Sequence, residues 1–345
     1  PEWLLSELKS GDRVGIDAWT NSISEIEDIN HILNKKNITL QFTTDPFDTI
    51  WEDRPAIPEN RVFIHDIKYS GLSAMEKIDA VRKYLDNNNR DILIVSVLDD
   101  ICWTLNLRGS DIHCNPLFIS YLIIGKSETV LYIEDKKLDY NVKEYLIAQN
   151  IQVRPYNSIA EDLKKISNEK FKIQVPTTIN GGIFDLVKKS AIIAPSPIIF
   201  MKAIKNETEI EGFHKAMIRD GVAMVKLIKW IKQAVKSGEE SELSVTKKAY
   251  ELRSQQELFM GESFDTIAGY KENAAIVHYK ADETSNKVLL PEGMLLLDSG
   301  GQYLDGTTDI TRTIILGNIN KEEREDYTLV LKGMINLAMT EFPHG

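Results

Sequence analysis

Two hydrophobic periods alternate along the middle of the chain. Over residues 71–85 the apolar side chains recur every three or four positions, which predicts a helix with one apolar stripe. Residues 92–97 form a short continuous apolar run, typical of a strand that is covered on both faces. The alternation continues to Ile193, with strands expected at 117–124 and 129–133 and helices at 142–148 and 159–166. This pattern predicts an α/β layer domain.

A shorter block of the same kind precedes this domain. Helix, strand, helix and strand are expected in turn at 3–8, 13–17, 22–33 and 38–43. Pro55 and Pro58 interrupt regular hydrogen bonding after this block, and Pro195 and Pro197 do so after the α/β domain. We therefore predict three parts: the closing part of a first domain at 1–57, an α/β domain at 58–196 and a third domain at 197–345.

The third part should open with the longest helix of the chain. Thr208-x-x-Glu211 has the pattern of a capping box, and apolar residues keep helical spacing from there to about residue 235. Beyond the Ser237-Gly238 break we expect a helix at 243–258, strand character from 264, an apolar strand at 274–279 and a last helix at 321–342.

Composition and charge narrow the classes of function. The chain has 345 residues, of which 43% are hydrophobic, and its formal net charge is −11. This charge repels nucleic acid and anionic lipid, and the sequence contains no basic run interleaved with aromatic residues. The longest apolar runs fall well short of the roughly 20 residues that cross a bilayer. We therefore predict no nucleic-acid partner and no membrane partner.

The two cysteines carry little chemistry of their own. Cys102 and Cys114 lie in an apolar stretch and form no CxxC pair. Two cysteines in a chain of this length are not a disulfide framework, so we predict buried structural thiols in a reducing compartment. The cytoplasm is the expected location.

The segment 295–313 offers the best candidate for chemistry. Two strand-like runs flank Asp305-Gly306, a strong turn signal, so the runs should fold into a hairpin that brings Asp298 and Asp309 together. Asp298 ends an apolar run, and an ionised carboxylate in such a position needs a cation or several hydrogen-bond donors. Both aspartates could instead be turn residues, since Asp beside Gly is common in loops. The spacing alone leaves the metal site and the turn as open alternatives.

His278 is a second candidate, at the end of the expected strand 274–279. A histidine on an apolar strand is more often a core residue that donates to a carbonyl than a functional group. Its place before Asp298 gains meaning only from a family resemblance.

Several motifs together carry such a resemblance. The stretch Ile276-Val277-His278-Tyr279, the stretch Leu297-Asp298-Ser299-Gly300 and the run from Asp305 to Thr313 resemble the signature of the pita-bread metallopeptidases. Residues 51–55, Trp-Glu-Asp-Arg-Pro, and 105–111, Leu-Asn-Leu-Arg-Gly-Ser-Asp, are similar to the three-domain, eukaryotic-type branch of the X-prolyl aminopeptidases, or aminopeptidases P. The resemblance covers essentially the whole chain.

This resemblance implies a fold and an activity. The fold would be α/β and α+β, with a creatinase-N-like α/β domain followed by the first half of a pita-bread catalytic domain. Such metalloaminopeptidases release the first residue of peptides with proline in the second position, through a hydroxide that bridges two divalent cations, usually Mn²⁺. Asp298 would match the aspartate that chelates one metal, Asp309 the aspartate shared by both, and His278 the histidine that contacts the substrate. Homodimers are common in the family.

The family completes its metal site with one histidine and two glutamates on later strands, and the motifs that carry them do not occur in this sequence. We do not expect His344 to be one of these ligands. The chain resembles a fragment trimmed at both ends, and we expect it to retain little metal and to be inactive by itself. An alternative from another class is a non-catalytic pita-bread homologue that acts as a binding or scaffold protein. Retention of both aspartates argues against that alternative.

Overall fold

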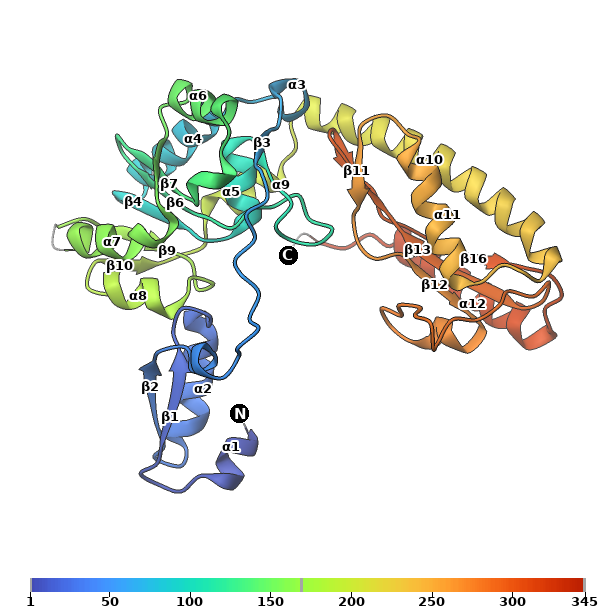
Figure 1. The fold of residues 1–345 in the computed structure, drawn as a ribbon, viewed down its shortest axis with the longest axis horizontal. Helices are drawn as coiled ribbons and strands as arrows, with labels where there is room; N and C mark the ends of the chain where they lie inside the picture. The colour runs from blue at the N-terminus through green and yellow to red at the C-terminus, as the bar shows by residue number, and fades with distance from the viewer. Residues whose placement is uncertain (1, 168–169, 344–345) are drawn as a thin grey trace. The chain divides into compact units, whose positions relative to one another are not determined.

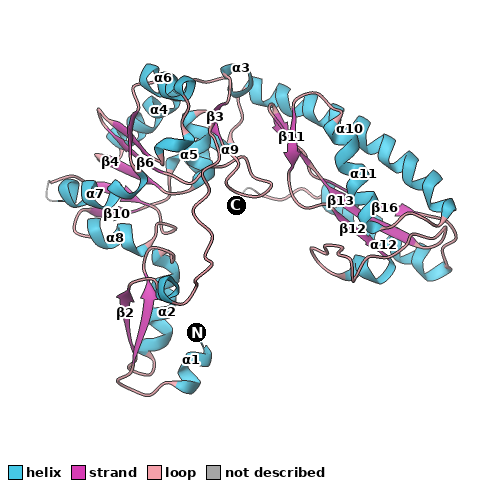
Figure 2. Ribbon diagram, in the orientation of Figure 1, coloured by secondary structure: helices cyan, strands magenta, loops and turns pink. Residues whose placement is uncertain are grey.

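The computed structural model describes residues 2–167 and 170–343, so His344 lies outside the described residues. The chain forms two compact units, Pro1–Thr208 and Glu209–Gly345, drawn in Figures 1 and 2. The division into three parts at 57 and 196 stays a prediction.

The first unit opens with a small parallel pair of strands. The elements are α1 (Glu2–Glu7), β1 (Arg13–Asp17), α2 (Ile23–Asn34), β2 (Thr39–Thr43) and the 3-10 turn η1 (Pro46–Thr49). Strands β1 and β2 pair in parallel. Helix α2 starts at Ser22, whose hydroxyl accepts from Glu25 N while Glu25 closes the capping box. Backbone bonds from Ile23 N to Ile179 O (2.9 Å) and from Gly181 N to Asn21 O (2.9 Å) join this block to the rest of the unit.

The centre of the first unit is a mixed sheet. Within the described residues it has six strands in the order β10-β9-β4-β6-β7-β8. Their bounds are β4 (Ile92–Val95), β6 (Tyr121–Gly125), β7 (Thr129–Tyr132), β8 (Gln152–Arg154), β9 (Ile173–Val175) and β10 (Ala191–Ile193). Strand β4 pairs in parallel with β9 and antiparallel with β6. A separate short pair joins β3 (Phe63–Ile64) to β5 (Leu107–Arg108).

Helices cover both faces of this sheet, as the continuous apolar run of β4 predicts. Leu93 and Val95 lie in one core with the helices α4 (Ala74–Asn87), α5 (Leu98–Leu105), α6 (Tyr140–Ala148) and α9 (Pro197–Ala203). Ile92 and Ile94 lie in a second core with α7 (Ile159–Ser167) and α8 (Gly181–Val187). Successive side chains of one strand thus supply two cores, because they point to opposite faces. The remaining helix of the unit is the short α3 (Ile67–Ser70).

The second unit packs two helices on a three-stranded antiparallel sheet. The helices are α10 (Glu207–Ala234), which continues from the first unit, and α11 (Glu242–Ser254), separated by η4 (Val235–Ser237) and Gly238 at φ 73°. The sheet has the order β12-β13-β16, with β12 (Ile267–Tyr270), β13 (Met294–Ser299) and β16 (Ile310–Ile315). Leu295 and Leu297 of β13 are fully buried against the two helices.

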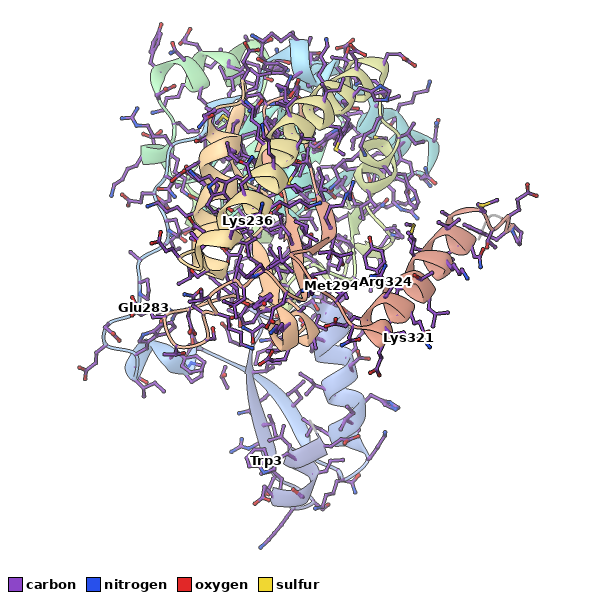
Figure 3. All side chains as sticks on the ribbon, turned by 90° about the vertical axis from the view of Figure 1, so that its right-hand side faces the viewer. Trp3, Lys236, Glu283, Met294, Lys321 and Arg324 are labelled. Atoms are coloured by element: carbon purple, nitrogen blue, oxygen red, sulfur yellow. The ribbon has the colours of Figure 1, made fainter. Side chains whose placement is uncertain are left out.

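A second, smaller sheet and a final helix complete this unit. The sheet has the order β11-β14-β15, with β11 (Phe259–Glu262), β14 (Gly301–Tyr303) and β15 (Gly306–Thr307). The final helix, α12 (Lys321–Ala338), has no buried residue. Figure 3 shows its side chains, with Lys321 and Arg324 labelled.

Three local expectations differ from the structure. The strand expected at 117–124 begins only at Tyr121. Helix α10 begins at Glu207, so Thr208 lies inside its first turn and not at the capping position. The strand expected at 274–279 is wrong, because 271–275 form the 3-10 turn η5 and Ile276 and Val277 are exposed. In the part of the chain that the structure describes, no helix is long and apolar enough to cross a membrane.

Candidate metal centre

Strand pairing places Asp298 and Asp309 on one face of the second unit's sheet. Strands β13 and β16 are antiparallel, with Asp298 directly opposite Thr311. Asp309 lies two residues before Thr311 and therefore points to the same face, as the diagonal neighbour of Asp298. The opposite face carries Leu295, Leu297 and Ile314, which form the core with α10 and α11. The turn lies at Leu304 and Asp305, one residue before the expected position, and the pairing of β13 with β16 on either side of it brings the two carboxylates to one face of the sheet.

Asp298 is the more enclosed of the two acids. It is half-buried in β13, between Ile267 of β12 and Thr311 of β16. Its Oδ1 atom is buried and accepts no hydrogen bond from any residue that the structure describes. A buried carboxylate oxygen without a donor is costly, and a cation would satisfy it.

Asp309 is exposed and lies between β15 and β16. Desolvation and the negative charge of Asp298 raise the pKa of Asp309 above its usual value. The two carboxylates are two like charges held close together, which a divalent cation would neutralise. The two aspartates therefore fit the donor set of a hard divalent metal.

The backbone beside both acids is fixed. Thr308 N donates to Gly301 O (2.9 Å), and the Ser263 hydroxyl donates to Thr308 O (2.8 Å). A side chain at Gly300 would collide with the Thr308 carbonyl and with Ser263, so glycine is needed for this close approach. These hydrogen bonds and the close approach at Gly300 fix the position of Asp309, which directly precedes β16.

Ion pairs tie the small hairpin to the helices. Arg219 of α10 bonds Asp305 in the turn between β14 and β15, and its guanidinium lies 5.4 Å from the Tyr303 ring centroid. The Tyr303 hydroxyl donates to Asp220 Oδ1 (2.9 Å), which also accepts from Arg253 Nε (2.7 Å). Asp305 is therefore a structural turn residue, as its place beside glycine predicts.

His278 is placed differently from the sequence expectation. It lies in an exposed turn after η5 (Lys271–Ala275) and has a left-handed φ of 56°. Within the described residues its side chain makes no hydrogen bond or ion pair, so the imidazole is not a core residue. The loop leaves β12 at Tyr270, opposite Leu295, whereas Asp298 is opposite Ile267. Strand pairing alone therefore does not bring His278 to the two acids.

Sequence reasoning missed the buried Glu242 at the start of α11, which accepts hydrogen bonds from both sides of His278. The only local signal is an acidic residue in a first helical turn, which usually means a favourable interaction with the helix dipole. Its partners are 28 to 45 residues away in sequence. No short-range pattern could reveal them.

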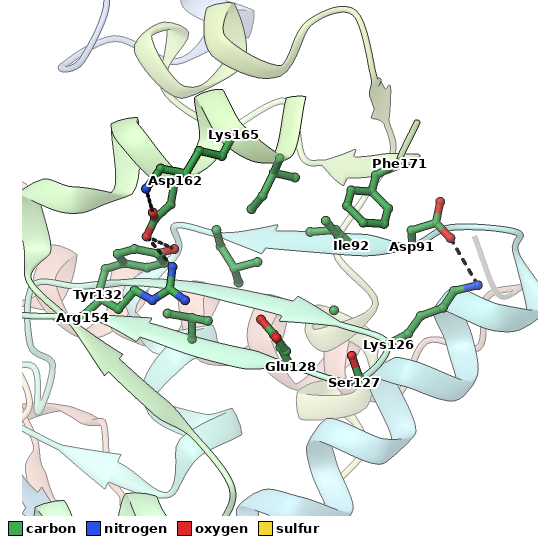
Figure 4. A pocket seen from close by; sticks show the side chains of 14 residues that line it. Asp91, Ile92, Lys126, Ser127, Glu128, Tyr132, Arg154, Asp162, Lys165 and Phe171 are labelled. Atoms are coloured by element: carbon green, nitrogen blue, oxygen red, sulfur yellow. Dashed lines mark hydrogen bonds and ion pairs between the residues drawn. The ribbon is translucent and has the colours of Figure 1, made fainter. Parts of the chain in front are cut away.

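A cavity of about 390 Å³ in the first unit, shown in Figure 4, contains none of the three candidate residues. Five of its charged groups, Asp91, Lys126, Arg154, Asp162 and Lys165, take part in ion pairs with one another, and Glu128 lines it outside these pairs. Asp162 accepts from Arg154 (2.6 Å), Lys165 (3.1 Å) and the Tyr132 hydroxyl (3.2 Å), and Lys126 lies 3.2 Å from Asp91. These pairs explain the packing of α7 on the sheet and assign no chemistry to the cavity.

Family models match two consecutive parts of the chain. Residues 53–209 match the creatinase/prolidase N-terminal domain, and residues 211–344 match metallopeptidase family M24. These matches confirm the expected order of an α/β domain followed by a pita-bread domain.

Curated relatives match over nearly the full chain. Xaa-Pro aminopeptidase 1 of Dictyostelium discoideum is 37% identical over 99% of this chain and 57% of its own length. A probable Xaa-Pro aminopeptidase P of Paracoccidioides brasiliensis is 38% identical over 100% of this chain and 59% of its own length. The chain thus spans less than two thirds of the length of these relatives.

Solved structures of Xaa-Pro peptidases have the same fold as this chain. X-prolyl aminopeptidase from Caenorhabditis elegans, described as a cytosolic enzyme with a di-nuclear active site, superposes with a TM-score of 0.93 at 31% identity. That match covers 99% of this chain and 57% of the other. The prolidase from Pyrococcus horikoshii OT3 shares the fold with a TM-score of 0.57 at 22% identity, over 78% of this chain and 73% of its own.

Proposed function

We propose, from the match of residues 211–344 to metallopeptidase family M24, that the chain is part of an Xaa-Pro aminopeptidase. The substrates would be peptides with proline in the second position, and the product their first residue. The named relatives from Dictyostelium discoideum and Caenorhabditis elegans support this substrate class. The observation that carries the proposal is the pair of convergent carboxylates, Asp298 and Asp309, with a buried oxygen that lacks a donor.

Asp298 and Asp309 would hold two divalent cations, the first acid binding one of them and the second binding both. The di-nuclear site named for the Caenorhabditis elegans enzyme supports the number of metals. Manganese is the metal we propose, since it accepts carboxylate ligands. When bound, such a pair of cations supplies an activated water at neutral pH and polarises the peptide carbonyl.

His278 would contact the substrate near the bond that is cut. Its imidazole is exposed and makes no other bond in the described structure, which leaves both ring nitrogens available. A neutral imidazole can donate one hydrogen bond to a substrate oxygen as charge develops there.

We propose that catalysis belongs to the full-length protein and that this chain by itself is inactive. Two carboxylates cannot fill the coordination shells of two cations by themselves. We also propose that the full-length enzyme is a cytoplasmic homodimer, which light scattering and fractionation would test.

The experiment is hydrolysis of an Xaa-Pro peptide in the presence of Mn²⁺, with the 345-residue chain and the full-length protein assayed in parallel. We expect turnover only by the full-length protein, and loss of both turnover and bound metal after Asp298→Asn or Asp309→Asn. Asp326→Asn, an exposed acid on α12, is the matched control. A full-length protein that cleaves no such peptide would instead favour a non-catalytic homologue. Turnover by the 345-residue chain would refute the proposal that it is inactive by itself.

A further inference from the structure

We propose that Glu242 is a positioning residue that acts on His278 through Tyr279. The inference rests on the role proposed above for His278 and adds a residue to it. Glu242 does not touch the substrate in this proposal. Its buried carboxylate fixes the loop on which His278 stands.

Among the residues that the structure describes, Glu242 is a buried acid with no basic partner. Its side chain is 0% exposed, and it occupies the first position of α11, directly after the N-cap Ser241. A buried carboxylate persists only where several donors stabilise the charge. The start of a helix supplies part of this stabilisation, because its free N–H groups favour a negative charge.

Four groups donate to this one carboxylate. Oε1 accepts from Tyr270 N (2.7 Å), and Oε2 accepts from the Tyr279 hydroxyl (2.8 Å) and from Lys287 N (3.0 Å). The Asn273 amide donates between both oxygens (3.0 and 3.1 Å). None of these four donors carries a charge, so the carboxylate is neutralised by hydrogen bonds and not by an ion pair.

All four donors belong to the segment that carries His278. Tyr270 and Lys287 stand at its two ends, and Asn273 and Tyr279 lie within it, on either side of His278. Asn273 also donates to the Tyr279 hydroxyl (2.9 Å). The loop is therefore closed around a single carboxylate from α11.

His278 itself depends on this closure. It adopts φ 56°, a left-handed conformation that a non-glycine residue keeps only where its surroundings enforce it. The side chains of the two preceding residues offer no anchor, because Ile276 is 54% exposed and Val277 is 83% exposed. In the described structure the backbone there is held only by the turn bond from Tyr279 N to Ile276 O (3.2 Å) and the bond from Ile276 N to Asn273 O (3.2 Å). The next residue, Tyr279, is buried and bonds Glu242. Tyr279 also bonds Ser285 O (3.2 Å) and Oγ (3.1 Å) at the far side of the loop.

The chemistry requires an acid at position 242. Charge-assisted hydrogen bonds are stronger than neutral ones, and a carboxylate accepts at both oxygens. In Glu242→Gln one oxygen becomes an NH₂ group that faces donors, so the loop loses acceptors and gains a repulsive contact. Tyr279→Phe is the milder change, since it removes one hydroxyl and leaves three donors on Glu242.

The first arm of the test uses the 345-residue chain and needs no activity. Histidine Cε1–H signals are followed by NMR in ¹³C-labelled protein, with the His278 signal assigned by His278→Gln. We expect Glu242→Gln and Tyr279→Phe to sharpen this signal and to move it toward that of free histidine, with a dispersed methyl spectrum as the check on folding. Tyr132→Phe removes a comparable hydroxyl–carboxylate bond to Asp162 and is the matched control. An unchanged His278 signal in Tyr279→Phe would overturn the inference.

The second arm uses the full-length enzyme with Mn²⁺. We expect Tyr279→Phe to lower kcat about tenfold, the order of one hydrogen bond to a charged group, with little change in KM. In a His278→Ala background the same substitution should leave kcat almost unchanged, because the imidazole that Tyr279 positions is already absent. An equal loss in both backgrounds, or no loss in either, would overturn the inference. If His278→Ala alone keeps full activity, the role proposed for His278 fails, and the NMR arm still decides whether Glu242 holds the loop.

Discussion

Removal of the Asp220 carboxylate should strongly destabilise the second unit. Asp220 of α10 is 0% exposed and accepts from Arg253 of α11 at 2.7 Å and 3.1 Å, and Arg253 is 1% exposed. Breaking a buried ion pair leaves the other charge unpaired at a cost of about 3–5 kcal/mol. The Arg253 Nη1 atom already has no acceptor among the described residues, so Asp220→Ala would leave the guanidinium without a carboxylate.

Two companion variants show whether the destabilisation comes from the unpaired Arg253 charge or from the loss of a single hydrogen bond. Tyr303→Phe removes only the 2.9 Å hydroxyl bond to Asp220 and should cost about 1 kcal/mol. Asp220→Leu combined with Arg253→Met replaces both charges by apolar side chains and should recover most of the loss, because such replacements are often neutral.

The assay is hydrogen–deuterium exchange read peptide by peptide, since a chain of two units has no single free energy of unfolding. In Asp220→Ala, exchange through opening of α10 and α11 should be faster by a factor of about 100 or more, the equivalent of about 3 kcal/mol. Peptides of α4 in the first unit serve as the internal control. The reasoning is refuted if Asp220→Ala accelerates α11 by less than about fivefold, or if the apolar double variant is as unstable as the single one.

Three further outcomes follow from the site and the core. Burial and the neighbouring carboxylate raise the pKa of Asp309, so the folded, metal-free chain holds that proton to higher pH than the unfolded chain. Its stability should therefore fall as pH rises from the usual aspartate range through the raised pKa, and Asp309→Asn should flatten this slope in urea unfolding with EDTA. Gly300→Ala should lower the free energy of local opening around β14 and β16, read by the same peptide exchange, by about 1–3 kcal/mol, whereas Gly333→Ala, with open space around it, should be neutral or stabilising. Burial raises the pKa of the Cys102 thiol to about 11, so a thiol reagent at neutral pH should modify the partly exposed Cys114 first; equal rates would contradict this.

Elements with a strong local period could be predicted from the sequence. The apolar stripe at 71–85 corresponds to α4, and the run at 92–97 contains β4, whose four residues are all buried. Both signals depend on neighbouring residues alone, so no tertiary information was needed. The closeness of Asp298 to Asp309 was also accessible, because the turn signal at Asp305-Gly306 lies between their strands. The turn itself is formed by Leu304 and Asp305, and Gly306 pairs with Tyr303.

Two local predictions from the sequence, the strand at 274–279 and the capping box at Thr208, failed because a short pattern does not fix hydrogen-bond partners. The apolar stretch 274–279 has the pattern of a strand, but its backbone bonds are those of a turn, from Ile276 N to Asn273 O and from Tyr279 N to Ile276 O. The Tyr279 hydroxyl donates to Glu242, 37 residues earlier, and Val277 faces solvent. Thr208 and Glu211 have the spacing of a capping box, yet the helix starts one residue earlier, at Glu207. Local patterns name the residue types that a cap or a strand needs. They do not say which distant group a side chain will bond, or at which residue the helix starts.

Helix α12 differs from the other long helices in what maintains it. None of its residues from Lys321 to Ala338 is buried, although Leu329, Val330 and Met334 are apolar. A capping box at Asn320 and a 3.5 Å pair between Lys321 and Glu325 contribute only small increments. A solvated helix of this length is close to the helix–coil midpoint in water. Heating this chain should therefore begin with a gradual, non-cooperative loss of helical signal, well before any of the three cores opens.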